Sequence, residues 1–214
     1  MKKLIIGILA TISIGSPVFS KQELYTVRSM DCMIAGRCID NVYRVKNIND
    51  IRSQSEYYSI SQEFNSIVSS LNKIGVKVFV GPEKYFPTEY RGIYHTESNN
   101  FYLNESHIQD PEVLISIMRH EGWHVAQDCM AGSIKNPVMA LLYPEKKVPQ
   151  VWYSVARKLY SKSEVPFEAE AKWAGNTKGM TSKALKVCSN GKMWNTYESN
   201  QSTRQWLRQE GYIN

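Results

Sequence analysis

The chain has 214 residues, of which 43 % are hydrophobic and 21 % are charged, and its formal net charge is +6. This length and composition are ordinary for one compact folded domain, and they exclude a disordered chain or a membrane bundle. The lysines and arginines are scattered and form no basic stripe that alternates with aromatic residues, so the positive charge gives no reason to expect a nucleic-acid partner.

The first twenty residues have the pattern of a signal peptide. Lys2 and Lys3 give a positive start, residues 4–14 are apolar but too few to cross a bilayer comfortably, and residues 18–20 suit a signal peptidase. No later run is long and apolar enough to span a membrane. We therefore expect a secreted or periplasmic protein with no stable membrane insertion after signal cleavage.

Four cysteines in a chain that is expected to leave the cytoplasm predict disulfide bonds. Cys32 and Cys38 are close in sequence and flank Gly36, which permits a tight loop. Pairing them leaves Cys129 with Cys188, but four cysteines allow three pairings and the sequence does not choose between them. A metal site made of these thiols is disfavoured, because no Cys-x-x-Cys spacing occurs.

Between residues 54 and 104 the sequence predicts one helix followed by three strands. The helix, residues 54–73, carries apolar side chains at helical spacing, and Gly75 is placed to end it. Ser98 and Asn99 supply turn chemistry for a hairpin between the last two strands. The expected strands are residues 76–80, 92–95 and 100–104.

A long helix is expected next, with Asp110 as its N-cap, Pro111 at its first position and Gly132 as its stop. After Pro144 the chain reads as mostly helical. The further expected helices are residues 151–160, 166–174, 181–187 and 202–209. This order predicts an α+β fold in which a small mixed or antiparallel sheet packs on the long helix, with a mostly helical C-terminal half.

The long helix contains the H-E-x-x-H pattern His120-Glu121-Gly122-Trp123-His124. Histidines four residues apart lie about 40° apart around a helix axis, so His120 and His124 can bind one Zn²⁺. Glu121 lies about 100° round from His120 and can face a zinc-bound water as the general base. The alternative is a histidine pair that packs in the core or caps carbonyls. The metal site is favoured, since the chain has only four histidines and the pattern falls in an expected helix.

A catalytic zinc ion usually takes three protein ligands, so a third ligand is needed. Pro166 opens a predicted helix that carries two carboxylates, Glu168 and Glu170. They are about 200° apart around that helix, so at most one of them should face the metal. The alternative is an acidic first turn that the helix dipole favours, and these residues alone do not choose between the two glutamates.

The H-E-x-x-H pattern followed by a downstream Glu-x-x-Ala on a helix resembles the gluzincins, which are zinc metallopeptidases of the zincin type. The resemblance covers roughly residues 76–174. It implies Glu168 as the third zinc ligand, with Glu170 as the second choice, and an edge strand before the motif helix that can hold an extended substrate. The implied organisation has three parts. They are a signal peptide (residues 1–20), an N-terminal extension with a disulfide loop (residues 21–50) and a zincin-like metallohydrolase domain (residues 51–214).

One departure from that family concerns Lys172. Gluzincins often have an acidic residue there that orients a zinc-bound histidine. The orienting partner is therefore expected elsewhere, with Asp128 as a candidate, or the histidine is expected to be oriented more weakly. His95 is expected to be a hydrogen-bonded structural histidine. An oxyanion stabiliser is also expected, but the sequence singles out none of three tyrosines in the right part of the chain: Tyr143, Tyr153 and Tyr160.

Three functions from different classes are compatible with these features. The first is a secreted zinc metallopeptidase that cleaves peptide or protein substrates, including cell-envelope material such as peptidoglycan cross-links. The second, which Lys172 favours, is a zincin-like metal-binding structural or interaction module without hydrolytic activity. The third is a disulfide-linked surface-binding domain in which the H-E-x-x-H pattern is accidental.

Overall fold

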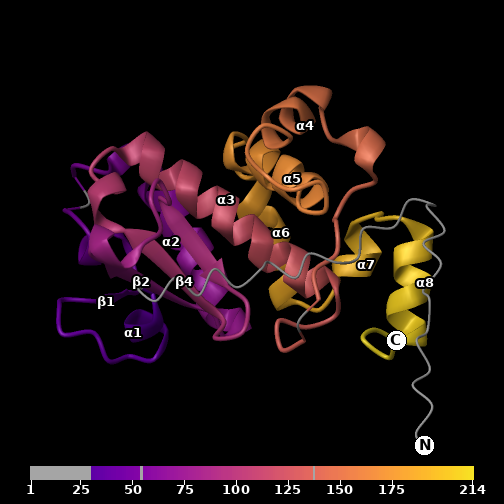
Figure 1. Cartoon of the computed structure of the whole chain (residues 1–214), viewed down its shortest axis with the longest axis horizontal. Helices are drawn as coiled ribbons and strands as arrows, with labels where there is room; N and C mark the ends of the chain where they lie inside the picture. The colour runs from indigo at the N-terminus through magenta and orange to yellow at the C-terminus, as the bar shows by residue number, and fades with distance from the viewer. Residues whose placement is uncertain (1–29, 54, 137) are drawn as a thin grey trace, which may run out of the picture.

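The structure is a computed structural model that describes residues 30–53, 55–136 and 138–214. The predicted signal peptide, residues 1–20, lies outside the described residues. Among the described helices, none is both long enough and apolar enough to cross a membrane. The fold is α+β: the sheet lies toward one end of the molecule, and helices α4 to α8 lie toward the other (Figure 1).

A four-stranded mixed sheet has the strand order β1-β2-β4-β3. The two outer pairs, β1 with β2 and β3 with β4, are antiparallel, whereas β2 and β4 are parallel. The three predicted strands and the hairpin are confirmed, and β1 was not predicted. The strands are β1 (Tyr43–Val45), β2 (Lys77–Gly81), β3 (Gly92–His95) and β4 (Asn100–Asn104). Strand β1 lies within residues 21–50, so the segment expected as an N-terminal extension contributes a strand to this sheet.

The sheet has an apolar layer on each face, because successive side chains of a strand point to opposite sides. On one face, the buried side chains of the strands join the core that helices α2 (Tyr58–Ile74) and α3 (Pro111–Met130) build: Val78, Val80, Tyr94, Phe101 and Leu103. On the other face, Phe79 and Tyr102 pack with Met30, Phe86 and the short helix α1 (Asp31–Ile34).

The C-terminal end of α2 and both ends of α3 follow the predicted capping residues, whereas α2 begins at Tyr58, four residues later than expected. Gly75 ends α2 with φ 105°, a left-handed conformation that glycine adopts without strain. At the start of α3, the side chain of Asp110 accepts hydrogen bonds from the backbone N–H groups of Glu112 and Val113. Gly132 follows the last turn with φ 108°, where a Cβ would clash with the carbonyl of Tyr212.

The C-terminal half is helical, as predicted, but one helix is shorter than expected. Helix α4 (Gln150–Ala156) stops short of Tyr160, because the N–H groups of Lys158 and Leu159 bond to carbonyls three residues back and tighten the last turn. The other helices are α5 (Val165–Gly175), α6 (Met180–Ser189), α7 (Met193–Thr196) and α8 (Gln201–Gln209). Short 3-10 turns occur at Ile48–Asp50, Glu83–Tyr85, Glu105–His107 and Glu145–Lys147.

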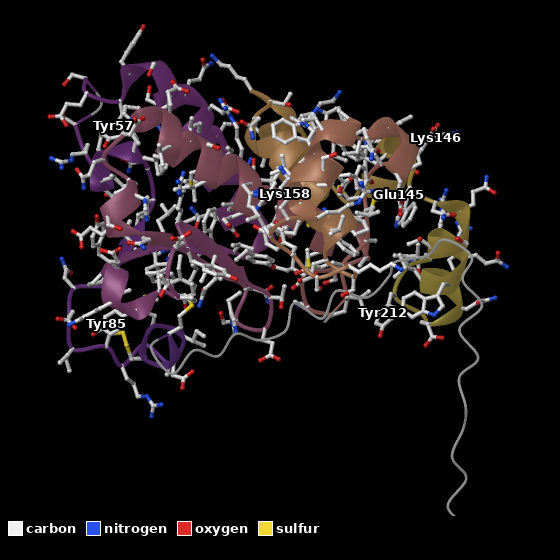
Figure 2. The ribbon with its side chains drawn as sticks, turned by 45° about the horizontal axis from the view of Figure 1, so that its top comes forward. Tyr57, Tyr85, Glu145, Lys146, Lys158 and Tyr212 are labelled. Carbon is white, nitrogen blue, oxygen red and sulfur yellow. A yellow bond between two sulfur atoms is a disulfide. The ribbon has the colours of Figure 1, made fainter. Side chains whose placement is uncertain are left out.

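Two disulfides are present, Cys32–Cys38 and Cys129–Cys188. The first closes a loop beside α1 and packs near Tyr85, where its yellow bond is visible in Figure 2. The second ties the end of α3 to α6 across 59 residues of sequence. These are the pairs obtained when the two cysteines nearest in sequence bond to each other.

Candidate metal centre

Helices α3 and α5 bring three metal-ligating side chains together. The Nε2 atom of His120 lies 3.4 Å from Glu168 Oε2, and Nε2 of His124 lies 3.4 Å from Glu168 Oε1. One ligand atom from each of the three residues falls within 4.8 Å of the others, so the group could hold a metal ion. Close helix packing makes this possible, because a Cβ on Gly175 of α5 would already lie 3.3 Å from the Cβ of His120.

The spacing of these atoms allows one metal ion to contact all three residues. With metal–ligand bonds of 2.0–2.1 Å, neighbouring ligands of a tetrahedron lie about 3.3 Å apart. Each imidazole lies near this distance from one oxygen of Glu168, His120 from Oε2 and His124 from Oε1. Glu168 Oε2 is also buried without a hydrogen-bond partner in the described part of the chain. A buried carboxylate oxygen is costly when it is left unpaired, and a cation would satisfy it.

The charges within this group are strongly coupled. Burial alone would lower the pKa of His124, but the Glu168 carboxylate and the charge of Glu121 outweigh burial and raise it to about 9. Burial would likewise raise the pKa of Glu168, yet the two imidazoles hold it well below its usual range. In the metal-free chain a proton therefore takes the place that a cation would occupy.

The orienting partner of His124 is Gln127, and the expectation of Asp128 is wrong. Gln127 Oε1 lies 2.9 Å from His124 Nδ1, while Gln127 Nε2 donates to Glu170 Oε2 at 2.8 Å and to the carbonyl of Phe167 at 3.1 Å. Because both amide donors are directed to those acceptors, Oε1 accepts the Nδ1 proton. When His124 is neutral, as a metal ligand must be, this leaves its Nε2 lone pair facing Glu168.

Glu170 points away from the imidazoles and anchors the surrounding structure. It is fully buried and accepts hydrogen bonds from Trp123 Nε1 at 2.9 Å and from Gln127. The backbone N–H groups of Leu142 and Tyr143 donate to its other oxygen at 3.0 and 2.7 Å. Of the two glutamates that the sequence left open, Glu168 is the one beside the histidines.

Asp128 belongs to a separate buried contact with the sheet. Its Oδ2 lies 2.8 Å from the phenol oxygen of Tyr94, which lies 3.0 Å from Oδ1 of Asn99. The phenol O–H of Tyr94 is the donor to Asp128. Burial outweighs this hydrogen bond and raises the pKa of Asp128 to about 8.

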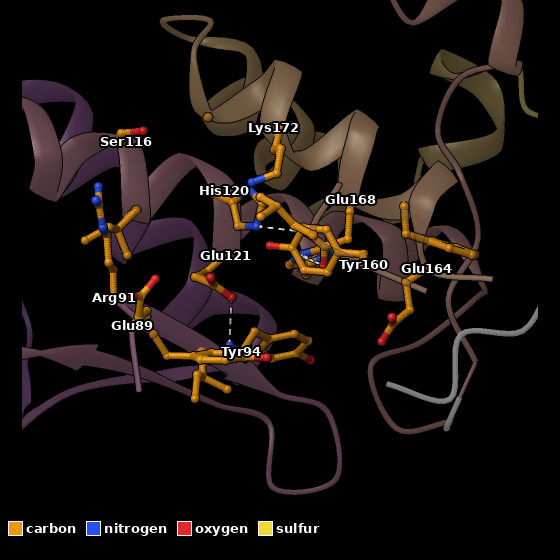
Figure 3. Close-up of a pocket in the computed structure, with 18 of the residues that line it drawn as sticks. Glu89, Arg91, Tyr94, Ser116, His120, Glu121, Tyr160, Glu164, Glu168 and Lys172 are labelled. Carbon is orange, nitrogen blue, oxygen red and sulfur yellow. Dashed lines mark hydrogen bonds and ion pairs between the residues drawn. The ribbon is translucent and has the colours of Figure 1, made fainter. Parts of the chain in front are cut away.

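Glu121 lies on the side of α3 that faces the sheet. Its Oε2 accepts a hydrogen bond from the backbone N–H of Tyr94 at 3.0 Å, shown as a dashed line in Figure 3. Gly92 allows this approach, since a Cβ there would lie 2.5 Å from Ile117 Cγ2 and 3.2 Å from Glu121 Cγ. The carboxylate is thus held beside the three candidate ligands and outside their group.

The candidate ligands and Glu121 line a cleft of about 1150 Å³. One wall is strand β3 and the other is α5 with residues 159–164. Strand β3 is an outer strand of the described sheet, and the N–H and carbonyl of Tyr94 point away from β4 toward the cleft side. Such an edge can pair with an extended chain.

The structure distinguishes the three tyrosines that the sequence did not. Tyr160 lines the cleft, and burial together with the negative charges of Glu168 and Glu121 raises its pKa. Tyr143 and Tyr153 share a hydrophobic cluster with Tyr160, but neither of them lines the cleft. His95 has a structural contact, because its Nδ1 accepts from the N–H of Ser98 in the hairpin turn, and it also lines the cleft.

No protein-family model matches the chain, and no curated protein or solved structure matches it either. The site is therefore argued from the residues of this chain alone. Gln127 was not identified from sequence, and Tyr160 was one of three tyrosines between which the sequence did not choose. Gln127 follows His124 by three residues, a spacing that places the two on one helix face and was an available signal. Tyr160 had none, because its position depends on where α4 ends.

Proposed function

We propose that this protein is an exported zinc-dependent peptidase of the zincin type, in which His120, His124 and Glu168 bind the metal and Glu121 is the catalytic base. The observation that carries the proposal is the convergence of two imidazoles and one carboxylate, whose ligand atoms lie within 4.8 Å of one another, with a second carboxylate, Glu121, beside them in an open cleft. A set of two nitrogens and one oxygen suits Zn²⁺.

The residues around the candidate centre divide the work of amide hydrolysis. A bound zinc ion would polarise the scissile carbonyl and lower the pKa of water. Glu121 takes a proton from the attacking water and passes it to the leaving amine. The phenol of Tyr160 donates a hydrogen bond to the carbonyl oxygen as it becomes negative, and its raised pKa keeps it protonated for that role. Strand β3 aligns the peptide.

Export and substrate follow from other features of the chain. The N-terminal pattern and the two disulfides support an oxidising compartment outside the cytoplasm. The open cleft beside an edge strand supports an extended peptide or protein segment, including cell-envelope peptides, as the substrate.

The replacement Glu121→Gln tests the proposal. It should lower kcat/KM for a cleaved peptide by about 10²–10⁴-fold, because the general base is lost, while one zinc ion per chain remains bound. The matched control is Glu112→Gln, an exposed position on the same helix. Hydrolysis that survives Glu121→Gln, or purified protein without zinc affinity, contradicts the proposal.

The second candidate is a metal-binding module without hydrolytic activity. Lys172 favours it, because a cation stands where the related peptidases have an acid. Stoichiometric zinc together with no cleavage across broad peptide libraries would support this candidate over the first.

A further inference from the structure

Lys172 lies one helical turn after Glu168 on α5, and both side chains line the cleft. The Lys172 ammonium lies 5.2 Å from the centre of the Tyr160 ring, at a distance where a cation–π contact holds it in place. Figure 3 shows the side chain reaching from α5 toward His120. The cation is therefore positioned in the cleft beside the candidate metal ligands.

This ammonium has no anionic partner among the residues that the structure describes. Across residues 30–53, 55–136 and 138–214, no carboxylate oxygen lies within 4 Å of it. Two acids of the cleft are engaged elsewhere, since Glu168 faces the imidazoles and Glu121 accepts from the Tyr94 N–H. A half-buried cation without a counter-charge is stabilised when an anion enters the cleft.

We propose that Lys172 is the binding subsite for a carboxylate of the substrate, so that this protein selects peptides with a carboxylate close to the cleaved bond. The inference rests on the proposed function. A helical turn rises about 5.4 Å and an extended peptide about 3.3 Å per residue, which places the carboxylate within two residues of the scissile bond. An acidic side chain and a free C-terminus offer the same group.

The cleavage test uses the zinc-loaded full chain and alanine-rich peptides that carry a single glutamate or glutamine at each position in turn. Each peptide is made with a free and with an amidated C-terminus, which separates the two sources of the carboxylate. We expect kcat/KM to favour one carboxylate position by about tenfold or more. Lys172→Gln should abolish that preference, and Lys172→Glu should transfer it to lysine-containing peptides.

The matched control is Lys186→Gln, an exposed lysine on α6 outside the cleft, which should keep the preference. Equal kcat/KM for all paired peptides, or a preference that persists in Lys172→Gln, overturns the proposal.

A binding test separates this proposal from the proposed function. The same peptides, labelled with fluorescein, are titrated onto the zinc-loaded Glu121→Gln chain, and fluorescence anisotropy gives Kd. Tighter binding of the carboxylate peptide that disappears on adding Lys172→Gln supports the subsite even if the wild-type chain cleaves nothing. Equal Kd values for the carboxylate peptide and its neutral counterpart contradict the subsite proposal, even if the wild-type chain is an active peptidase.

Discussion

Gln127 and Asp128 follow His124 on α3, and both are fully buried, yet their surroundings differ. Gln127 is a neutral hydrogen-bonding link between His124 and Glu170, with both of its functional atoms engaged. Asp128 contacts the sheet through Tyr94 and retains a buried oxygen, Oδ1, without a partner among the described residues. Each predicts a different response to substitution.

Replacing Gln127 with leucine should weaken zinc binding by about 10–100-fold, because His124 loses the acceptor that fixes its tautomer. The measurement is zinc Kd by competition with a chelator. Gln205→Leu, an exposed glutamine on α8, is the control. The thermal midpoint of the metal-free variant separates a general loss of stability from a loss of metal affinity, and an unchanged Kd would exclude Gln127 from the site.

Asp128 should make stability depend on pH. Its folded-state pKa of about 8 lies above the ordinary value of 3.8, so the folded protein keeps a proton that the unfolded chain releases. The stabilisation is complete below about pH 4 and is lost as the pH rises toward 8, at up to about 1.4 kcal/mol per pH unit. Asp128→Asn should remove this slope in urea unfolding measured from pH 5 to pH 8. Parallel curves for the two proteins would show that Asp128 is ionised when folded.

At the scale of elements, the contact of β3 with α3 depends on Gly92. In Gly92→Ala the new methyl group would lie 2.5 Å from Ile117 Cγ2, so the strand must shift away from the helix and loosen the Tyr94 to Glu121 hydrogen bond. We expect a loss of about 1–3 kcal/mol in unfolding free energy and a lower kcat, with zinc affinity retained.

A double-mutant cycle with Ile117→Ala provides the control for Gly92→Ala. The smaller side chain makes room for the methyl group. The double variant should therefore lose less unfolding free energy than the two single variants lose when their losses are added. Additive losses would mean that the Ile117 contact does not limit the position of β3.

The sequence predicted those elements whose signals are local. The caps Asp110 and Gly75 act within one turn, so α2 and α3 were placed to within a few residues of their ends. Strand β1 was missed because three residues are too few to show a period, and its partner β2 is distant in the sequence. The position of Tyr160 in the cleft was not predicted, because it depends on where α4 ends. That end is a tight last turn, and no glycine or proline in the sequence indicates it.

In the candidate site, too, the relations within one helix could be predicted from sequence and those between helices could not. One helical turn fixes the relation of His120 to His124, and this relation can be calculated from sequence alone. The choice between Glu168 and Glu170 depends on how α5 packs against α3, which local spacing does not contain. The family resemblance supplied that choice, while its expectation for the partner of His124 required correction to Gln127.

At the scale of the whole molecule, the Cys129–Cys188 disulfide closes a much longer loop than Cys32–Cys38, at separations of 59 and 6 residues. The chain-entropy model then assigns about 4 kcal/mol to the long loop and about 2 kcal/mol to the short one. Replacing both cysteines of the long loop by serine should therefore lower the unfolding free energy more than the same change in the short loop. Chemical unfolding of the two double variants measures this difference, and the reverse order would contradict it.

Helix α5 carries three charged side chains that lie in three different surroundings. Glu168 faces the imidazoles, Glu170 contacts the backbone of residues 142–143, and Lys172 lines the cleft. Under the proposed function, a substitution of Glu168 would change metal affinity and one of Lys172 would change the choice of substrate. A substitution of Glu170 would disturb residues 142–143 and Gln127 together. A change of length would affect all of these at once, because one residue inserted just before Glu168 turns all three side chains by about 100°. Natural variants of this protein should therefore differ in the amino acids of this helix while keeping its residue count constant.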